Sequence, residues 1–326
     1  MHPGVAARVD PHRLPEPGQP EQQLTGRPRT RHRTRALVVH RPSVNSWQRL
    51  DAIAALAART PHQRDLAARP ARPRGSAPVG SGGMKLREED VTIAADGYDI
   101  QARVVAPVGA GPWPGLLLYT DIFQLTESTL RTARRLAAAG FLVCAPEIYP
   151  RGELAGVALE FDDAGKAAGL GAASATTTAE FDADRAAVLD HLAGRDDVGV
   201  LHAAGFCIGG HLAFRAALDP RVAATVCFYP TGLHDGKLGA DDPGSLAAAD
   251  RIRGRLMVIF GAQDPHVPAP ARVRILDALY AAGHDDLELH VYAQGEHAFM
   301  RDVGGRYDPA LTDLGLAEAV SFLRGR

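Results

Sequence analysis

The stretch Val198-Gly-Val-Leu-His-Ala-Ala-Gly-Phe-Cys-Ile-Gly-Gly210 decides the fold of this sequence. An apolar run up to Ala204 predicts a buried strand, and the helical spacing of residues 210–218 predicts a helix directly after it. Between them, Gly205-Phe-Cys207-Ile-Gly209 has the pattern of a nucleophile elbow, with cysteine in the place of serine. Such a turn is strained, so small residues must flank the nucleophile. The positive N-terminal end of the following helix would favour the thiolate of Cys207.

The same alternation of strand and helix extends in both directions from this turn. Residues 90–94 and 98–106 alternate around Asp96-Gly97, a pair typical of hairpin turns. The pattern predicts further strands at 115–120, 141–145, 222–228, 256–260 and 287–292, and helices at 129–139, 179–192, 269–281 and 311–323, with a loop region between 146 and 178. This order predicts an α/β fold with a mostly parallel central sheet and helices on both faces.

Two more polar residues follow predicted strands at the edge where reactive groups belong in a parallel sheet. Asp264 comes after the strand at 256–260, and His297 comes after the strand at 287–292. The order Cys207, Asp264, His297 is that of the α/β-hydrolase fold. His297 could move protons near neutral pH, and Asp264 would fix its tautomer and stabilise the imidazolium. We therefore expect these three residues to form a catalytic triad.

A structural interpretation competes at each of these positions. A histidine or aspartate in a loop is commonly a solvated side chain or a turn former. For Cys207 the structural interpretation requires a strained, glycine-flanked turn in which the cysteine has no functional role. Other residues of the same types are assigned to packing or the surface: Cys144 and Cys227 as inert strand residues, His211 and His266 as packing or surface histidines, and Glu296 as exposed.

The first 83 residues differ in composition and charge from the rest of the sequence. They contain fourteen arginines, no lysine and five acids, a balance of +9, so a net charge of -2 leaves -11 for residues 84–326. The arginines are scattered among Pro, Ala and Gln without an aromatic platform, which favours a disordered extension over a nucleic-acid-binding arm. A transit peptide is the competing interpretation, but the prolines disfavour a targeting helix. We expect the folded domain to span 84–326, beginning at Met84, and the extension could reflect a start codon assigned too early.

Composition also restricts location and partners. With 46% hydrophobic and 23% charged residues, the sequence is that of an ordinary globular protein. Its three cysteines form no C-x-x-C pair, and the sequence has no signal-peptide core and no apolar run of about 18 residues. We expect a cytoplasmic protein that binds neither nucleic acid nor membrane.

Over residues 84–326 the sequence resembles the dienelactone hydrolase family. The resemblance rests on Gly205-Phe-Cys-Ile-Gly-Gly210, on Asp264-Pro-His-Val-Pro268, and on His297-Ala-Phe with Arg301 four residues after the histidine. It implies a monomeric hydrolase of cyclic enol esters, similar to carboxymethylenebutenolidase, that uses a Cys-His-Asp triad and neither cofactor nor metal. It also implies that Arg301 binds a substrate carboxylate. The family has a second arginine for this purpose, which neither Arg151 nor Lys166 matches.

The residue after the first central strand departs from the family pattern. The family usually has a glutamate there, in contact with the resting thiol, whereas this sequence has Asp121, shorter by one methylene. The resemblance implies that Asp121 tunes the nucleophile and that the backbone amides of Ile122 and Ile208 form the oxyanion hole. The alternative is that Asp121 only caps the turn after the strand.

A cysteine nucleophile restricts the classes of substrate that the site could cleave. A thiolate leaves a tetrahedral intermediate more readily than an alkoxide does, so a good competing leaving group is needed. Enol lactones, aryl esters and thioesters therefore fit better than amides. We expect a hydrolase of a small carboxylic ester or lactone, carboxylate-bearing if Arg301 binds it. The alternatives are a thioesterase or other acyl hydrolase on the same triad, and a non-catalytic binding protein of the same fold.

Overall fold

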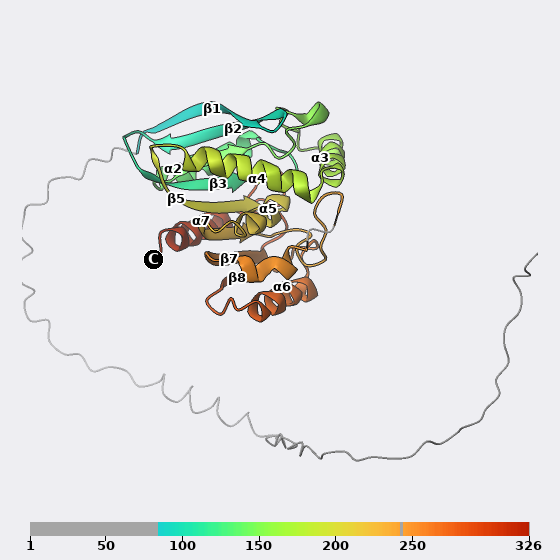
Figure 1. The fold of residues 1–326 in the computed structure, drawn as a ribbon. Coiled ribbons are helices and arrows are strands. Elements are labelled where there is room, and N and C mark those ends of the chain that lie inside the picture. Colours follow the sequence, from blue (N-terminus) through green and yellow to red (C-terminus); the bar gives the residue numbers. More distant parts are fainter. Residues whose placement is uncertain (1–83, 242–243, 326) are drawn as a thin grey trace, which may run out of the picture. The chain divides into compact units, whose positions relative to one another are not determined.

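Eight strands form one sheet in the computed structural model, which describes residues 84–241 and 244–325 (Figure 1). The strands are β1 (Leu86–Ala95), β2 (Tyr98–Pro107), β3 (Trp113–Tyr119), β4 (Leu142–Pro146), β5 (Val198–Phe206), β6 (Val222–Phe228), β7 (Arg255–Gly261) and β8 (Glu288–Tyr292). Their order across the sheet is β1-β2-β4-β3-β5-β6-β7-β8. Strand β2 pairs antiparallel with β1 and β4, and all other neighbours in this sheet are parallel. The predicted extension at residues 1–83 lies outside the described residues.

The predicted hairpin is confirmed and closes through a two-residue turn. Ala95 pairs with Tyr98, and Gly97 between them has a φ of 82°. A two-residue hairpin turn needs this left-handed conformation, which glycine adopts without a steric penalty.

Helices cover both faces of the sheet, as the alternating pattern predicts. They are α2 (Glu127–Ala138), α3 (Asp163–Ala175), α4 (Thr178–Ala193), α5 (Ile208–Ala216), α6 (Ala269–Ala281) and α7 (Pro309–Leu323), with short 3-10 helices at Gly152–Leu154 and Leu246–Arg251. Helices α4, α5 and α6 share one apolar core with Leu117 and Tyr119, whereas α2 and α7 share another with Leu116 and Leu118. Because successive strand residues point to opposite faces, the continuous apolar run of β3 contributes side chains to both cores.

Helix α3 is the exception to the sequence prediction, which assigned this segment to a loop. Its N-cap Asp162 accepts a hydrogen bond from the Gly165 backbone N–H at 2.7 Å. Its buried residues are only Gly165, Gly169 and Ala173. The prediction was wrong because these small residues give no apolar period, although the aspartate before the segment is a helix-start signal.

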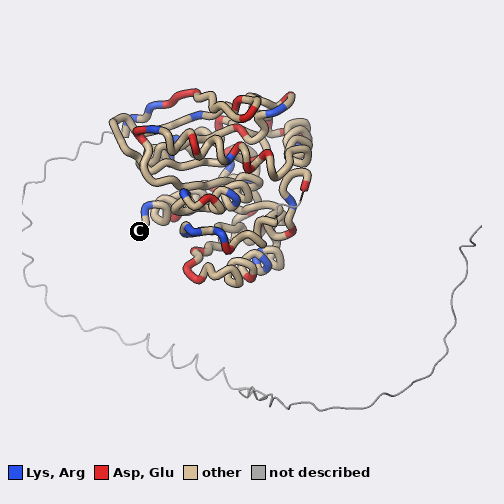
Figure 2. Tube along the Cα trace, in the orientation of Figure 1, with Lys and Arg blue, Asp and Glu red and all other residues tan. Residues whose placement is uncertain are grey.

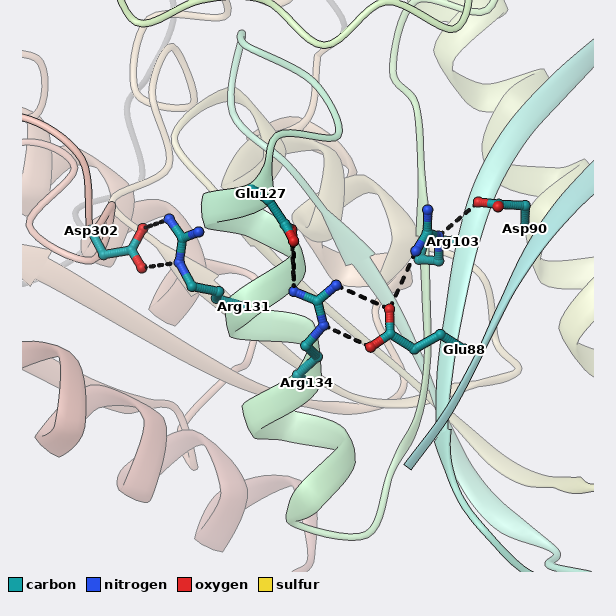
Figure 3. A network of polar contacts seen from close by, with 7 residues as sticks. All are labelled: Glu88, Asp90, Arg103, Glu127, Arg131, Arg134 and Asp302. Carbon is teal, nitrogen blue, oxygen red and sulfur yellow. Dashed lines mark hydrogen bonds and ion pairs between the residues drawn. The ribbon is translucent and has the colours of Figure 1, made fainter. Parts of the chain in front are cut away.

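Charged residues lie mainly on the outer elements of the described chain, and β3 and β6 contain none (Figure 2). One cluster links the β1–β2 hairpin to α2 (Figure 3). The Arg134 guanidinium on α2 donates to both oxygens of Glu88 at 2.7 and 3.0 Å, and Glu88 also accepts from Arg103 on β2 at 3.2 Å. Within the part of the chain that the structure covers, no helix combines the length and apolar character needed to span a membrane.

Candidate active site

The turn between β5 and α5 has the geometry of a strained elbow. Cys207 lies at the N-cap of α5 with φ 60° and ψ -121°, a conformation that costs a non-glycine residue about 1–3 kcal/mol. A Cβ at Gly205 would lie 2.0 Å from the Gly209 carbonyl oxygen, and one at Gly209 would lie 2.1 Å from that of Thr120. No side chain fits at either position. The Cys207 side chain is partly exposed, in contrast to the fully buried Cys144 and Cys227.

His297 lies between the other two predicted site residues and contacts both. Its Nε2 is 3.2 Å from the Cys207 Sγ, and its Nδ1 is 2.8 Å from the Asp264 Oδ2. His297 is 7% exposed and Asp264 is 2% exposed, so solvent competes little for these contacts. The structure therefore brings together, in one hydrogen-bonded series, residues that follow three different strands.

Backbone contacts between the loops after β7 and β8 hold this arrangement. A Cβ at Gly261, the last residue of β7, would lie 2.2 Å from the Gly295 carbonyl oxygen, so the end of β7 and the loop after β8 touch through glycines. The free oxygen of Asp264, Oδ1, accepts a hydrogen bond from the His266 backbone N–H at 2.7 Å. The ring of His266 meets the ring of His297 edge-on at 4.5 Å between centroids. His266, assigned to packing or the surface from the sequence, is exposed but also lies against the imidazole.

Electrostatics favour a charged imidazole. Burial alone would lower the pKa of His297, but negative charge on the Cys207 sulfur and the hydrogen bond to Asp264 raise it to about 10. Burial would raise the pKa of Asp264, but the hydrogen bond and charge of His297 outweigh it and lower this pKa. The hydrogen bond to Asp264 and negative charge on the neighbouring sulfur thus favour the protonated form of His297.

Thr231 is a site residue that the sequence did not reveal. Its hydroxyl lies 3.6 Å from the Cys207 Sγ, and its backbone N–H donates to the Cys207 carbonyl at 3.1 Å. The buried His211, on the first turn of α5, contacts the Thr231 carbonyl through Nδ1 at 3.2 Å. The available signal was position alone, because Thr231 follows the end of β6 at the edge where the other site residues lie.

Asp121 contacts a cation and a turn amide rather than the thiol. Its Oδ1 accepts from the Phe123 backbone N–H at 3.0 Å, and its Oδ2 accepts from the Arg301 Nη1 at 3.1 Å. Burial raises the pKa of this carboxyl, and the charge of Arg301 opposes that shift. In the described chain the sulfur's polar contacts are His297 and Thr231. Asp121 thus fills the turn-capping position, and its effect on the nucleophile stays a prediction.

Arg301 is held over two aromatic rings beside the elbow. Its guanidinium carbon lies 5.0 Å from the ring centroids of both Phe123 and Phe161. Its Nε is buried without a hydrogen-bond partner. The neighbouring Asp302 accepts from Arg131 of α2 at 2.8 Å, which fixes the backbone next to Arg301 (Figure 3).

The elbow opens into a cavity of about 680 Å³ that Cys207, His297 and Arg301 line. Part of its wall is apolar and comes from Ile122, Phe123, Phe161 and Leu170. Charged side chains of both signs line it in equal number: Lys166, Lys237, Arg301 and Arg306 against Asp121, Asp162, Asp163 and Asp235. The cavity therefore has no strong overall field, and a charged substrate would depend on local contacts.

The two cations considered for a second carboxylate contact lie in different places. Lys166 of α3 lines the cavity. Arg151 forms a two-pronged ion pair with Asp184 at 2.7 and 2.9 Å and stacks 3.9 Å from the Tyr98 ring centroid. Arg151 is thus committed to a structural contact.

Comparisons with known proteins agree with this architecture. The sequence profile of the dienelactone hydrolase family matches residues 100–325. A Saccharomyces cerevisiae protein named "Putative carboxymethylenebutenolidase" is 34% identical over 228 residues, which cover 66% of this chain and 83% of that protein. A protein of the same name from Escherichia coli is 30% identical over 240 residues, covering 72% of this chain and 85% of that protein.

A solved structure gives the same result for the fold. The crystal structure of a "Putative Dienelactone Hydrolase from Klebsiella pneumoniae subsp. pneumoniae MGH 78578" superposes with a TM-score of 0.64 at 24% identity. The match covers 74% of this chain and 100% of the Klebsiella chain. The chain therefore belongs to the dienelactone hydrolase family and has its α/β-hydrolase fold.

Proposed function

We propose that this protein hydrolyses a small carboxylic ester or lactone through an acyl-enzyme intermediate on Cys207. The chain belongs to the dienelactone hydrolase family, which supports the hydrolysis of an ester or lactone. The observation that carries the mechanism is the series Cys207, His297 and Asp264. His297 touches both partners at 3.2 and 2.8 Å, and the sulfur faces a cavity of about 680 Å³. That volume suits a small molecule.

Acylation begins with the thiolate of Cys207, which attacks the substrate carbonyl carbon. A C–S bond forms, and the carbonyl π electrons move to oxygen. The resulting oxyanion accepts hydrogen bonds from the backbone N–H groups of Ile208 and Ile122. Ile208 is suited to this role because it opens α5, and amides in a first helical turn have no partner within the helix. Collapse breaks the ester C–O bond, and the His297 imidazolium gives its proton to the leaving oxygen.

Deacylation reverses these roles with water. Neutral His297 takes a proton from a water molecule as its oxygen attacks the thioester carbon. The second tetrahedral intermediate collapses with cleavage of the C–S bond, which releases the carboxylic acid and restores the thiolate beside the imidazolium. Asp264 keeps the Nδ1 proton of His297 in place throughout, so that Nε2 faces the sulfur and the substrate.

Arg301 supports a substrate that bears a carboxylate. Its Nη1 already contacts Asp121, so a second carboxylate would compete for this guanidinium. Lys166, on the wall formed by α3, offers a second positive charge. Phe123 and Phe161 provide flat apolar surfaces for the rest of an unsaturated substrate.

A non-catalytic binding protein of the same fold is the main alternative class. It would require an occluded elbow or a histidine displaced from the cysteine. The partial exposure of Cys207 and the 3.2 Å contact of His297 oppose this alternative. The site chemistry also needs the thiol in its reduced form, which fits a cytoplasmic location. The monomeric state that the resemblance implies can be checked by gel filtration.

The direct test is turnover of p-nitrophenyl acetate, followed by a panel of an enol lactone, a thioester, and aryl esters with and without a carboxylate. We expect turnover of the activated esters and progressive inactivation by iodoacetamide, with one label on Cys207 by mass spectrometry. A protein labelled completely at Cys207 that kept its turnover would rule out the proposed nucleophile. Preference for the thioester over the lactone would favour the thioesterase alternative.

The influence of Asp121 on the thiol can be measured in the same assay. Asp121→Glu extends the carboxylate by one methylene, toward the length that the family usually has. A negative charge closer to the sulfur disfavours the thiolate, so the pH profile of Cys207 alkylation should move to higher pH. An unchanged profile in a folded variant would leave Asp121 with its turn-capping role alone.

A further inference from the structure

Helix α3 packs on the body of the protein through its smallest residues. The three buried residues, Gly165, Gly169 and Ala173, recur every fourth position and therefore form one face of the helix. A Cβ at Gly165 would lie 2.1 Å from the Glu160 carbonyl oxygen. The helix thus lies closer to its neighbours than any larger residue on this face would allow.

The contact at Gly169 falls on the proposed oxyanion hole. A Cβ there would lie 2.3 Å from the Ile122 carbonyl oxygen, 3.1 Å from its carbonyl carbon and 3.2 Å from its Cβ. Real Cβ atoms essentially never approach other heavy atoms within 3.0 Å. The backbone of α3 therefore lies directly against the residue whose N–H is proposed to bind the oxyanion.

A second glycine holds the same turn from the elbow. Gly209 of α5 lies against the Thr120 carbonyl oxygen, 2.1 Å from where its Cβ would be. The carbonyls of Thr120 and Ile122 flank the peptide that carries the Ile122 N–H. Each of them is thus packed against a glycine, one from α5 and one from α3.

We propose that Gly169 of α3 is a positioning residue, which fixes the Ile122 N–H in the oxyanion hole. This inference rests on the proposed function. An added Cβ would have to move from 2.3 Å to at least 3.0 Å from the Ile122 oxygen, so the turn or the helix must shift. An oxyanion donor works at about 2.7–3.1 Å from the developing charge, and a shift of this size takes it out of range.

The test is Gly169→Ala in the full chain, assayed with p-nitrophenyl acetate and with iodoacetamide. We expect kcat to fall about tenfold or more, since loss of a whole donor lowers kcat about 10²–10³-fold. KM should change little. Alkylation of Cys207 should stay within about twofold of the wild-type rate, because displacement of iodide forms no oxyanion. This split separates a positioning role from general damage to the site.

Two variants of the same helix are matched controls. A Cβ added at Gly171 would meet no atom within 4 Å, so Gly171→Ala tests helix composition alone and should keep the wild-type kcat. Gly165→Ala creates a backbone clash of the same kind, 2.1 Å from Glu160, but away from Ile122. It should lower thermal stability as Gly169→Ala does, while kcat stays within about threefold of wild type.

Several results would overturn the inference while leaving the proposed function intact. Wild-type turnover that disappears in Cys207→Ala supports the proposed function, whatever Gly169→Ala does. Given that turnover, the positioning role fails if Gly169→Ala keeps its kcat, if Gly165→Ala loses as much, or if alkylation falls in parallel. It also fails if Gly169→Ala does not fold while Gly165→Ala does, because the contact would then be purely structural.

Discussion

The elbow at Cys207 and helix α3 both press glycines against the turn that follows β3, yet only the elbow could be identified from the sequence. At the elbow, Gly209 lies against the Thr120 carbonyl, and the glycines surround a cysteine at a fixed spacing. On α3, Gly169 lies against the Ile122 carbonyl, but the segment Asp-Ala-Gly-Lys-Ala-Ala-Gly-Leu-Gly-Ala-Ala-Ser-Ala has neither a reactive residue nor an apolar period.

The difference shows what makes a backbone contact visible in a sequence. A close backbone contact leaves a recognisable sequence pattern when the residue between the glycines must be a reactive one, as at the elbow. The same kind of contact leaves no pattern when its purpose is to position another segment. We therefore expect the two regions to differ in function as they differ in sequence.

The largest effect is expected at the elbow itself. Cys207→Ala should reduce kcat by about 10⁴-fold or more, and His297→Ala should be nearly as severe, because triad members act as a unit. The double variant should be no worse than either single one. Asp264→Asn should reduce kcat less. Steady-state kinetics would check this, with circular dichroism as a folding control. A near-normal kcat in a folded Cys207→Ala variant would show that the elbow does not carry the nucleophile.

Alanine scanning of the glycines sharpens the comparison. Gly205→Ala would place a Cβ 2.0 Å from backbone and should destabilise the fold by about 3 kcal/mol or more. Gly171→Ala on α3 meets open space and should stabilise the protein by about 0.5–1 kcal/mol, the usual gain for alanine over glycine in a helix. Chemical denaturation would measure both. Equal effects would mean that the elbow is no more constrained than the helix.

The two regions should also differ in their response to pH. The pKa of His297 is raised above its ordinary value to about 10, so its contribution to stability is complete below about pH 6.5 and disappears as pH rises toward 10. We expect the free energy of unfolding to fall more steeply over this window in the wild type than in His297→Gln. The contacts of α3 with Glu160 and Ile122 are made by backbone and contain no titrating group. Hydrogen exchange that proceeds through local opening of α3 should therefore follow the same pH dependence in both proteins.

Substrate binding offers a smaller but more specific comparison of the two walls of the cavity. Arg301→Ala should raise KM about tenfold for an aryl ester that carries a carboxylate and less than about twofold for its neutral analogue, as expected for one charge-assisted contact. Lys166→Ala, on α3, would show the same selectivity if the helix also takes part in recognition. Equal changes for both esters in Arg301→Ala would exclude recognition of the carboxylate by this residue.

The smallest effect is expected outside the two regions. A chain that begins at Met84 should keep kcat, KM and thermal stability within experimental error, because the described contacts that join the triad and Arg301 to their neighbours lie within residues 119–301. A truncated chain that failed to fold or lost most of its turnover would show that residues 1–83 support the domain.

Much of the fold could be predicted because the strands of a buried parallel sheet appear in the sequence as short apolar runs between helical segments. Strand β6 (222–228) and helix α6 (269–281) have the predicted bounds, and the predicted hairpin pairs at Ala95 and Tyr98. Helix α3 was missed because small residues that dock through backbone carry no hydrophobic period. Tertiary contact, rather than local pattern, accounts for its place.

The site divides in the same way. Cys207, Asp264 and His297 could be selected because they follow predicted strands in a characteristic order, and the structure brings them into contact. The contact of Arg301 with Asp121 could not be predicted from the sequence, because it joins two loops that no local sequence pattern connects. Thr231 was missed because a threonine after a strand carries no chemical signature of its own.

The contacts that build the site also have a consequence for how the chain acquires activity. The His297–Cys207 contact spans 90 residues of sequence, and the Arg301–Asp121 ion pair spans 180. Closing loops of such length costs more conformational entropy than forming local contacts, so we expect these contacts to form late in folding. A refolding intermediate with only the central strands paired would hold the thiol but lack the imidazole. Recovery of turnover during refolding would therefore time the docking of the last strand, β8, rather than the collapse of the core.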